Sequence, residues 1–301
     1  MTLNELRFIV AVAQERNFRR AAEKAFISQP ALSLAIQKLE DELGLKIFER
    51  GKNDVALTPG GSAIVEQAQR VLEEAERIRE IAAQGKNQRT TPLHIGVIHS
   101  VGPYLLPDLI PALKKVAPQM ALEVEENITA NLETLLRNGK LDVIVIALPF
   151  GDASILTLPL YDEQFEVVVS SDHRWAARRS IKAPELAEEK VLLLNSGHCF
   201  SNQVAEACPD LNRKGAEIQR GTSLETIRNM VASGLGITVL PASANSARYR
   251  SRLLSVVPFA KPIPSRRIAL AWRKSFARTQ AIEALAQAVA QAKITGITHL
   301  P

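Results

Sequence analysis

NFRRAAEKAFISQPALSLAIQKLEDELG, residues 17–44, predicts two helices joined by a tight break. Asn17 can cap the first helix and Ser28 the second, because their side chains accept the backbone N–H groups that a helix start leaves unpaired. Pro30 falls in the first turn of the second helix, where its missing N–H costs nothing. Gly44 then ends that helix. The stretch therefore predicts a compact pair of helices that cross closely.

The second helix has two distinct faces. Its apolar side chains recur at steps of four, three and four, at Leu32, Ile36, Leu39 and Leu43. Gln29, Ser33 and Gln37 lie on another face, one to each turn. A helix-turn-helix protein presents such polar side chains to base edges in the major groove. The alternative is a small helical domain that only packs against another part of the protein.

Residues 45–61, LKIFERGKNDVALTPGG, predict a wing made of two short extended segments around the turn GKND. Arg50 and Lys52 lie at this turn and can reach phosphates. Such contacts fix the position of a protein on DNA rather than its sequence preference.

Residues 21–61 resemble the winged helix-turn-helix of the LysR-type transcriptional regulators. The resemblance rests on Ala21–Ala22, Ser28–Gln29–Pro30, Ser33, Leu39–Glu40, Gly44, Phe48–Glu49–Arg50 and Thr58–Pro59–Gly61. It implies double-stranded DNA as a partner, with Gln29, Pro30, Ser33 and Gln37 facing the bases. The other residues that we expect to contact DNA are Arg19, Arg20, Ser28, Arg50 and Lys52.

Residues 61–84 repeat every seven positions over about three heptads. The apolar positions are Ile64, Ala68, Val71, Ala75, Ile78 and Ala82. This pattern predicts a two-stranded coiled coil and hence a dimer, which would place two reading heads on one duplex. The alternative is a long helix packed on its own domain. GKNQRTTP, residues 85–92, then predicts a hinge.

Strand-like and helix-like segments alternate after Pro92, which favours α/β layers with mostly parallel sheets. We expect a DNA-binding domain over residues 1–60, a dimerisation helix over 61–87 and a regulatory domain over 88–301. The LysR-type resemblance implies that the regulatory domain resembles a periplasmic binding protein. Subdomain I would span about 91–162 plus 267–301, and subdomain II about 163–266.

Composition and net charge indicate the cellular location of the chain and the class of partner that it binds. The net charge of +5 and the pI of about 9.3 fit nucleic-acid binding. The sequence contains no apolar run long enough to span a membrane and no signal-peptide pattern at its start. We therefore expect a cytoplasmic protein, where a stable structural disulfide is rare.

Both cysteines of the chain lie in GHCFSNQVAEAC, residues 197–208. The five histidines show no zinc-ligand spacing with them, so we predict no metal and no cofactor. A catalytic Cys199 beside His198 is a second interpretation, but neighbours in sequence point in different directions. A thiol switch is the third, and two small buried apolar residues are the fourth.

Helix geometry bears on the thiol switch. If the segment is helical, nine residue steps place the two Cα atoms about 13–14 Å apart. A disulfide needs Cα atoms roughly 4.4–6.8 Å apart. Disulfide formation would then require the helix to unwind, which makes oxidation a conformational event. Positive charge near a sensor thiol favours its ionised form, and His198 and Arg266 are the candidates.

The whole chain resembles the peroxide-sensing members of the LysR-type family. The similar segments include IHSVGPYLLPDLIPAL, GKLDVIVIAL, GHCFSNQ and KPIPSRRIAL. The resemblance implies that Cys199 is the peroxidatic thiol and Cys208 the resolving one. It places Ser100, Thr129, His198, Asn202 and Arg266 around the reactive sulfur. Two of these depart from the family pattern, which has Thr at 100 and Asp at 202, and Asn202 would slow the reaction if the acid transfers a proton.

These observations together predict a transcription regulator that responds to hydrogen peroxide and activates oxidative-stress genes. We expect a tetramer built as a dimer of dimers, with RNA polymerase as a partner, and no enzymatic turnover. A LysR-type regulator triggered by a small metabolite between the subdomains is the first alternative. A thiol peroxidase is the second alternative, but such an enzyme has no use for the reading head or the coiled coil.

Overall fold

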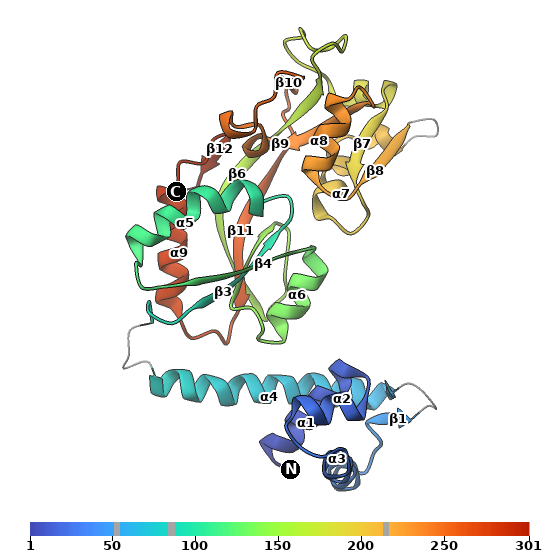
Figure 1. Cartoon of the computed structure of the whole chain (residues 1–301), viewed down its shortest axis with the longest axis vertical. Helices are drawn as coiled ribbons and strands as arrows, with labels where there is room; N and C mark the ends of the chain where they lie inside the picture. Colours follow the sequence, from blue (N-terminus) through green and yellow to red (C-terminus); the bar gives the residue numbers. More distant parts are fainter. Residues whose placement is uncertain (51–54, 84–87, 213–216, 301) are drawn as a thin grey trace. The chain divides into compact units, whose positions relative to one another are not determined.

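The computed structural model describes residues 1–50, 55–83, 88–212 and 217–300 (Figure 1). The chain divides into two compact units, Met1–Lys86 and Asn87–Pro301. In the described residues no helix is long and apolar enough to cross a membrane.

The first unit is a winged helical domain followed by a long helix. Its elements are α1 (Leu3–Glu15), α2 (Phe18–Lys24), α3 (Gln29–Leu43), β1 (Phe48–Arg50), β2 (Val55–Leu57) and α4 (Pro59–Ala83). Asn17 caps α2, because its side chain accepts the N–H groups of Arg19 and Arg20 at 2.9 and 3.1 Å. Ser28 caps α3 and Gly44 ends it at φ 71°, as predicted. β1 and β2 pair antiparallel and form the predicted wing, whose turn at 51–54, including Lys52, lies outside the described residues.

The core of this unit includes a helix that the sequence reading did not use. Leu32, Ile36 and Leu39 are buried, but Leu43 is 37% exposed, so its place in the apolar stripe was wrong. Helix α1 completes this core, because it packs on α2, α3 and α4. The buried Glu40 carboxylate ties α3 to the wing, since Oε1 accepts the N–H groups of Ile47 and Phe48 at 2.8 and 3.2 Å.

The long helix α4 is partly packed on its own domain and partly uncovered. Ala68 is buried, and Ile64 packs against the same core, so the alternative reading holds for these two positions. Val71 and Ile78 are 37% and 69% exposed, and Ala75 is half-buried. The side chain of Ala82 lies outside the described residues. The apolar edge of the second half therefore has no cover within this chain's described residues.

The second unit is built on a mixed sheet. Its strands follow the order β4-β3-β5-β11-β6-β9-β7-β8, and β10 and β12 pair with β6. The long strand β6 (Ile155–Ser170) runs through both halves, and β11 (Ser265–Arg273) pairs antiparallel with it and with β5. The expectation of mostly parallel sheets was therefore wrong: β3 pairs in parallel with β4 and β5, and β7 with β8 and β9, but the strands that join the halves are antiparallel.

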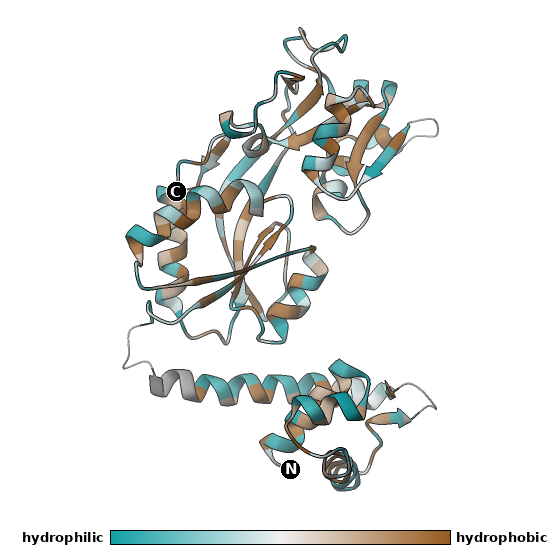
Figure 2. Cartoon of the chain, viewed as in Figure 1, coloured by the Kyte–Doolittle hydropathy of each residue, from teal (hydrophilic) through white to brown (hydrophobic). Residues whose placement is uncertain are grey.

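Two separate hydrophobic cores lie along this sheet. The first core is enclosed by β3 (Leu93–Ile98), β4 (Leu122–Asn127), β5 (Val143–Ala147), α5 (Gly102–Val116), α6 (Thr129–Arg137) and α9 (Thr279–Gln291). The second is enclosed by β7 (Val191–Leu194), β8 (Ile218–Gly221), β9 (Ile237–Pro241), β10 (Leu254–Pro258), α7 (Cys199–Ala207) and α8 (Leu224–Ala232). Short 3-10 helices lie at Ala183–Glu188, Pro209–Asn212, Ala242–Asn245 and Ala247–Tyr249, and β12 spans Ile297–His299. Figure 2 shows brown, hydrophobic residues concentrated on the strands and on the inner faces of the helices.

Glycines end two of the helices. α6 ends at Arg137 and α8 at Ala232, because the chain turns at Gly139 and Gly234 with φ of 68° and 77°. Part of the expected hinge is fixed: the Arg278 guanidinium donates to the carbonyls of Gln88, Thr91 and Pro92.

Candidate functional site

Helix α7 carries both cysteines, one at each end. Cys199 is its first residue, and Cys208 caps its end by donating its N–H to the Val204 carbonyl at 2.9 Å. Both are free thiols. The predicted helix is confirmed and begins two residues earlier than expected. Across a helix of this length the two Cα atoms are roughly 13 Å apart, well beyond disulfide range.

Cys199 lines a small, closely packed hollow that leaves no free room for a water molecule. The hollow lies where β3 and β4 end and where α6 and α7 begin, at the carboxyl edge of parallel strands. Of the predicted pocket residues, the structure brings Ser100, Thr129 and His198 around Cys199. His99 and Asn127 also line the hollow, and the sequence reading assigned neither.

The two other predicted pocket residues lie outside this lining. Asn202 is exposed on α7. Arg266 is buried on β11 and reaches the hollow through Ser100, donating to the Ser100 hydroxyl at 2.7 Å and to its carbonyl at 2.8 Å. Because the Ser100 oxygen accepts from Arg266, its own O–H is free to donate elsewhere. Arg266 thereby restricts the hydroxyl that lacks the methyl of a threonine.

Arg266 is itself held on all sides. Its Nε donates to Glu163 at 2.8 Å, and both side chains of this ion pair are fully buried. The guanidinium carbon lies 4.8 Å from the Phe200 ring centroid, within cation–π range. Glu163 also accepts the backbone N–H of Ser243 at 3.1 Å. Glu163 therefore neutralises the Arg266 charge that was expected to act on Cys199.

One hydroxyl in the hollow is unsatisfied. Thr129 Oγ1 is buried and has no hydrogen-bond partner among the residues that the structure describes. A buried hydroxyl without a partner costs free energy, which a small polar ligand in the hollow would recover. The hollow therefore presents two hydroxyl groups and a sulfur to any molecule that enters it.

Electrostatics separate the two cysteines. Burial raises the pKa of Cys208 to about 11, and Asp210 adds to the rise, so this sulfur stays a thiol in the folded protein. Cys199 is half-buried at a helix N-terminus, where the backbone dipole favours negative charge. Burial lowers the pKa of His198, and the charge of His99 lowers it further. His198 is therefore neutral at neutral pH, which corrects the expectation that it supplies positive charge.

Hydrogen bonds and an aromatic contact hold helix α7 against the sheet beside it. Arg220 on β8 donates to the Ser201 hydroxyl at 2.7 Å and to the Leu194 carbonyl at 2.8 Å. Phe200 packs edge-on against Phe165 with ring centroids 5.1 Å apart. Unwinding of α7 has to break these contacts.

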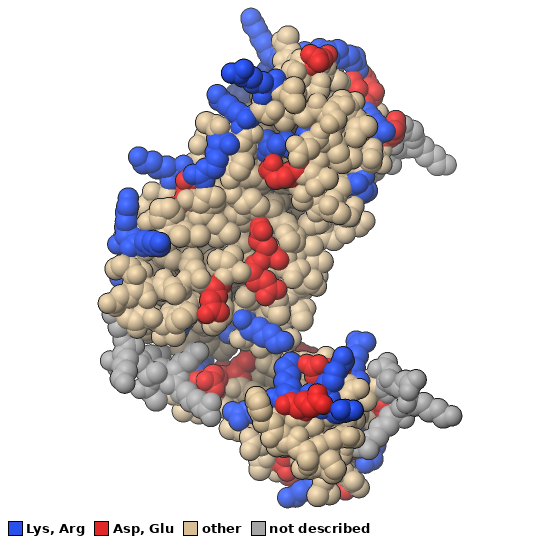
Figure 3. Space-filling view, viewed as in Figure 1, with Lys and Arg blue, Asp and Glu red and all other residues tan. Residues whose placement is uncertain are grey.

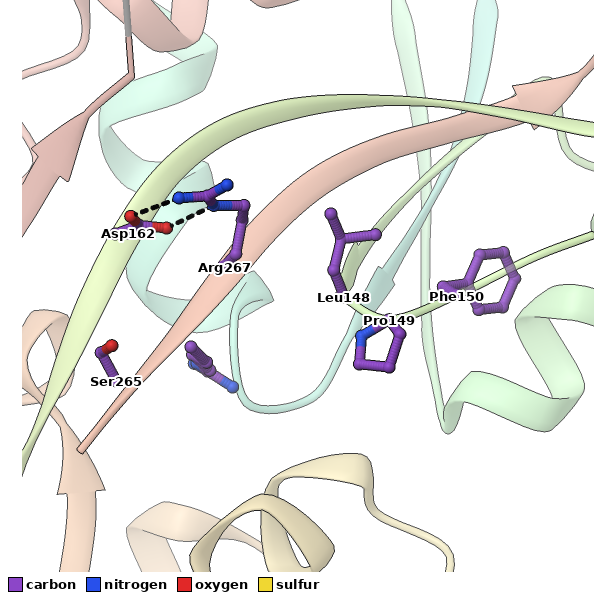
Figure 4. Close-up of a pocket in the computed structure, with 7 residues that line it drawn as sticks. Leu148, Pro149, Phe150, Asp162, Ser265 and Arg267 are labelled. Carbon is purple, nitrogen blue, oxygen red and sulfur yellow. Dashed lines mark hydrogen bonds and ion pairs between the residues drawn. The ribbon is translucent and has the colours of Figure 1, made fainter. Parts of the chain in front are cut away.

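A second, wider pocket lies beside the end of β5, the middle of β6 and the start of β11 (Figure 4). It has a volume of about 580 Å³ and opens broadly to solvent. Leu148, Pro149 and Phe150 line one side, and Arg267 on the other is paired with Asp162 at 2.7 and 2.8 Å. In the described part of the chain no group of three or more His, Cys, Asp or Glu side chains could hold a metal ion.

The candidate DNA-reading face lies on α2 and α3. Gln29, Pro30 and Gln37 are exposed, and Ser33 is half-buried. Arg19 and Arg20 are exposed, but each lies beside a carboxylate, Glu23 and Glu15 respectively. The Ser28 hydroxyl is used by the helix cap, and the side chain of Arg50 lies outside the described residues. Figure 3 shows Lys and Arg interleaved with Asp and Glu on this unit, so position rather than bulk charge marks the face.

Phe26 is a feature of this face that the sequence reading missed. It is 95% exposed and lies in the turn between α2 and α3 with φ 55°.

Comparisons with known proteins agree along the whole chain. Residues 3–62 match the family model for bacterial regulatory helix-turn-helix proteins of the lysR family, and residues 86–293 match the LysR substrate binding domain. The chain is 40% identical over 289 residues to the DNA-binding transcriptional dual regulator OxyR of Escherichia coli, covering 96% of this chain and 95% of that protein. It is also similar to a full-length OxyR variant from Pseudomonas aeruginosa, with a TM-score of 0.83, 51% identity and coverage of 100% and 99%. An H2O2-bound mutant of Corynebacterium glutamicum OxyR matches with a TM-score of 0.65, 34% identity and coverage of 96% and 92%.

Proposed function

The chain belongs to the LysR family of bacterial transcriptional regulators, and from this premise we propose that it senses hydrogen peroxide and regulates transcription of oxidative-stress genes. The observation that carries the proposal is the position of the two free thiols. Cys199 faces a hollow with hydroxyl groups, and Cys208 lies at the far end of the same helix. Relatives described as hydrogen peroxide-inducible genes activators support the choice of oxidant.

The chemistry has two steps. The Cys199 thiolate attacks one peroxide oxygen; the S–O bond forms, the O–O bond breaks and the leaving oxygen departs as water after taking a proton. Cys208 then gives up its proton and its sulfur attacks the sulfenic sulfur; the S–S bond forms, the S–O bond breaks, and the leaving hydroxide takes up a proton to depart as a second water. Ser100 and Thr129 supply hydroxyl groups that can orient the peroxide in the hollow.

The second step requires α7 to unwind. The helix keeps the two sulfurs apart, and burial with its raised pKa keeps Cys208 protonated while the fold is intact. Unwinding brings Cys208 into water and toward Cys199. Unwinding breaks the hydrogen bond from Arg220 to Ser201 and the packing of Phe200. The loss of these contacts then alters the contact between the two halves of residues 88–301. This change is the signal that the regulatory domain passes on.

The DNA contacts follow from the face of α3. Gln29, Pro30, Ser33 and Gln37 read bases, and Arg19, Arg20, Ser28, Arg50 and Lys52 hold the backbone. The exposed apolar edge of α4 fits a partner copy, which makes residues 61–87 the dimerisation element. Two dimers form a tetramer, and RNA polymerase is the partner at the promoter. The protein works in the cytoplasm and does not turn over peroxide as an enzyme.

DNase footprinting of reduced and peroxide-treated protein on its own promoter tests this function. Peroxide should shift the footprint of the wild type and leave that of Cys199→Ser unchanged. Cys208→Ser is the matched control, because it can form the sulfenic acid but not the intramolecular disulfide. A wild-type footprint that ignores peroxide contradicts the proposal.

The open pocket at β5, β6 and β11 favours one further candidate, a regulator triggered by a metabolite. Calorimetry of the reduced protein with small carboxylates is the discriminating experiment. Heat of binding together with a footprint that changes without oxidation would favour the metabolite over peroxide.

A further inference from the structure

His99 is the hollow-lining side chain whose chemistry the proposed function leaves unused. It follows β3 directly and lines the hollow together with Cys199, Ser100, Thr129 and His198. Its ring centroid lies 5.5 Å from that of His198, and the two rings are tilted by 54°. Peroxide cleavage needs a group that can deliver a proton to the leaving oxygen.

The other candidates in the site are poorly suited to this task. Asn202 is exposed, lies outside the lining of the hollow and carries no exchangeable acid proton. His198 has a lowered pKa from burial and from the charge of His99, so it stays neutral. Arg266 does not give up protons in proteins. The remaining candidate is His99, a half-buried imidazole that lines the same hollow as Cys199.

We propose that the His99 imidazole is the proton carrier of the peroxide reaction at Cys199. This inference rests on the proposed function. His99 first accepts the Cys199 thiol proton, which leaves a thiolate beside an imidazolium. The thiolate attacks peroxide, the S–O bond forms, the O–O bond breaks, and the imidazolium proton passes to the departing oxygen. The products are a sulfenic acid, water and neutral His99.

The charged groups around His99 favour this assignment. Glu126, at the end of β4, interacts electrostatically with His99; burial raises the pKa of its carboxyl and the histidine charge opposes that rise. The Glu126 side chain is held against Gly102, where a β-carbon would fall 2.2 Å from its carboxylate oxygen. From α7 the facing groups are His198 and Cys199, and α6 contributes the uncharged Thr129. From β11 the Arg266 charge is cancelled by Glu163. Glu126 is therefore an acidic group that interacts with His99, and its ionised form stabilises an imidazolium.

The assignment makes the reaction depend on pH in a specific way. The step needs a thiolate at Cys199, so the rate constant should rise with pH at the acid end. It also needs a proton on His99, so the rate constant should fall again at the alkaline end. The wild type should therefore show a bell-shaped profile, and His99→Gln should keep the rising limb and lose the falling one.

The test measures sulfenic acid formation in the full-length chain. All variants carry Cys208→Ser, so that the first step alone is followed, by trapping with dimedone and mass spectrometry after stoichiometric peroxide. His99→Gln should lower the maximal rate constant by about 100-fold, the low end of general acid–base effects. His94→Gln is the matched control: it lies at the start of β3 with its side chain 46% exposed, and it should leave rate and profile unchanged.

A second variant keeps the inference open to refutation if His99→Gln does not fold. His99→Ala removes the ring, and added imidazole should then restore part of the rate. A His99→Gln protein with the wild-type rate and a bell-shaped profile overturns the inference, as does a slow His99→Ala protein that imidazole does not rescue. Failure of the wild type to form any sulfenic acid would instead overturn the proposed function.

Discussion

Glu163→Gln tests whether the buried ion pair holds the hollow together. Arg266 and Glu163 are both fully buried, and the pair is 2.8 Å apart. The substitution keeps the shape of the side chain but removes its charge, so the Arg266 cation is left buried without a counterion. Breaking a buried pair in this way costs about 3–5 kcal/mol, which lowers the melting temperature of a domain of this size by roughly 6–20 °C.

Asp162→Asn is the matched control. Asp162 precedes Glu163 on the same strand and pairs with Arg267, but these side chains are 35% and 48% exposed. An exposed pair contributes about 0–1 kcal/mol, so the expected shift is at most about 4 °C. The two ion pairs are neighbours on the same two strands. The difference between their melting-temperature shifts therefore reports the effect of burial.

Tryptophan fluorescence during heating is the assay, on reduced full-length protein. Trp175 and Trp272 are the two tryptophans of the chain and both lie in the second unit, so the signal reports that unit alone. Glu163→Gln combined with Arg266→Gln should be less destabilised than the sum of the single variants. Melting temperatures that fall equally little in Glu163→Gln and Asp162→Asn would refute the reasoning.

Three further predictions concern the wing and the resolving thiol. Gly61→Ala should unfold the wing and abolish DNA binding in a mobility shift, because its β-carbon would lie 2.1 Å from the Ile47 carbonyl oxygen; Gly60→Ala, with 3.9 Å of room, should bind normally. Burial raises the pKa of Glu40, but hydrogen bonds and Lys46 outweigh it and the net pKa is lowered. Its stabilisation is therefore complete above about pH 4.5 and is lost as pH falls through the lowered pKa, and Glu40→Gln should flatten the acid limb of circular dichroism melts. Cys208, with a pKa of about 11, should react with iodoacetamide at pH 7 much more slowly in the folded protein than in urea, and equal rates would contradict its burial.

Local chemistry made much of the first unit predictable. The Asn17 and Ser28 caps, Pro30 and Gly44 each require a specific backbone position, and each is found where the sequence places it. The stripe failed at Leu43, the last residue of α3, which is 37% exposed although Glu40 in the same turn is buried. α1 has no comparable signal, since its role emerges only from packing on three other helices.

The mixed sheet was out of reach of local patterns. β6 contributes to both halves of the second unit, and its antiparallel pairing with β11 joins residues about a hundred positions apart in sequence. The sequence gives no local sign of which strands meet. The same long-range pairing buries Arg266 against Glu163 and brings Ser100 to both.

The candidate site was predicted in part. The family resemblance placed Ser100, Thr129, His198 and Cys199 together, and the structure lines one hollow with them. Asn202 lies outside that lining and His99 lies within it. His99 could have been noticed as the neighbour of Ser100, but a single histidine after a strand carries no signal until the fold brings His198 beside it.

Disulfide formation between Cys199 and Cys208 should be coupled to the unwinding of helix α7, and both changes can be measured directly. Full-length protein treated with one equivalent of peroxide should be digested and mapped by mass spectrometry, alongside hydrogen–deuterium exchange over residues 199–207. The account predicts an intramolecular disulfide between Cys199 and Cys208 and loss of amide protection along α7. A disulfide that forms while α7 keeps its protection, or oxidation that stops at Cys199 with Cys208 still a thiol, would contradict it.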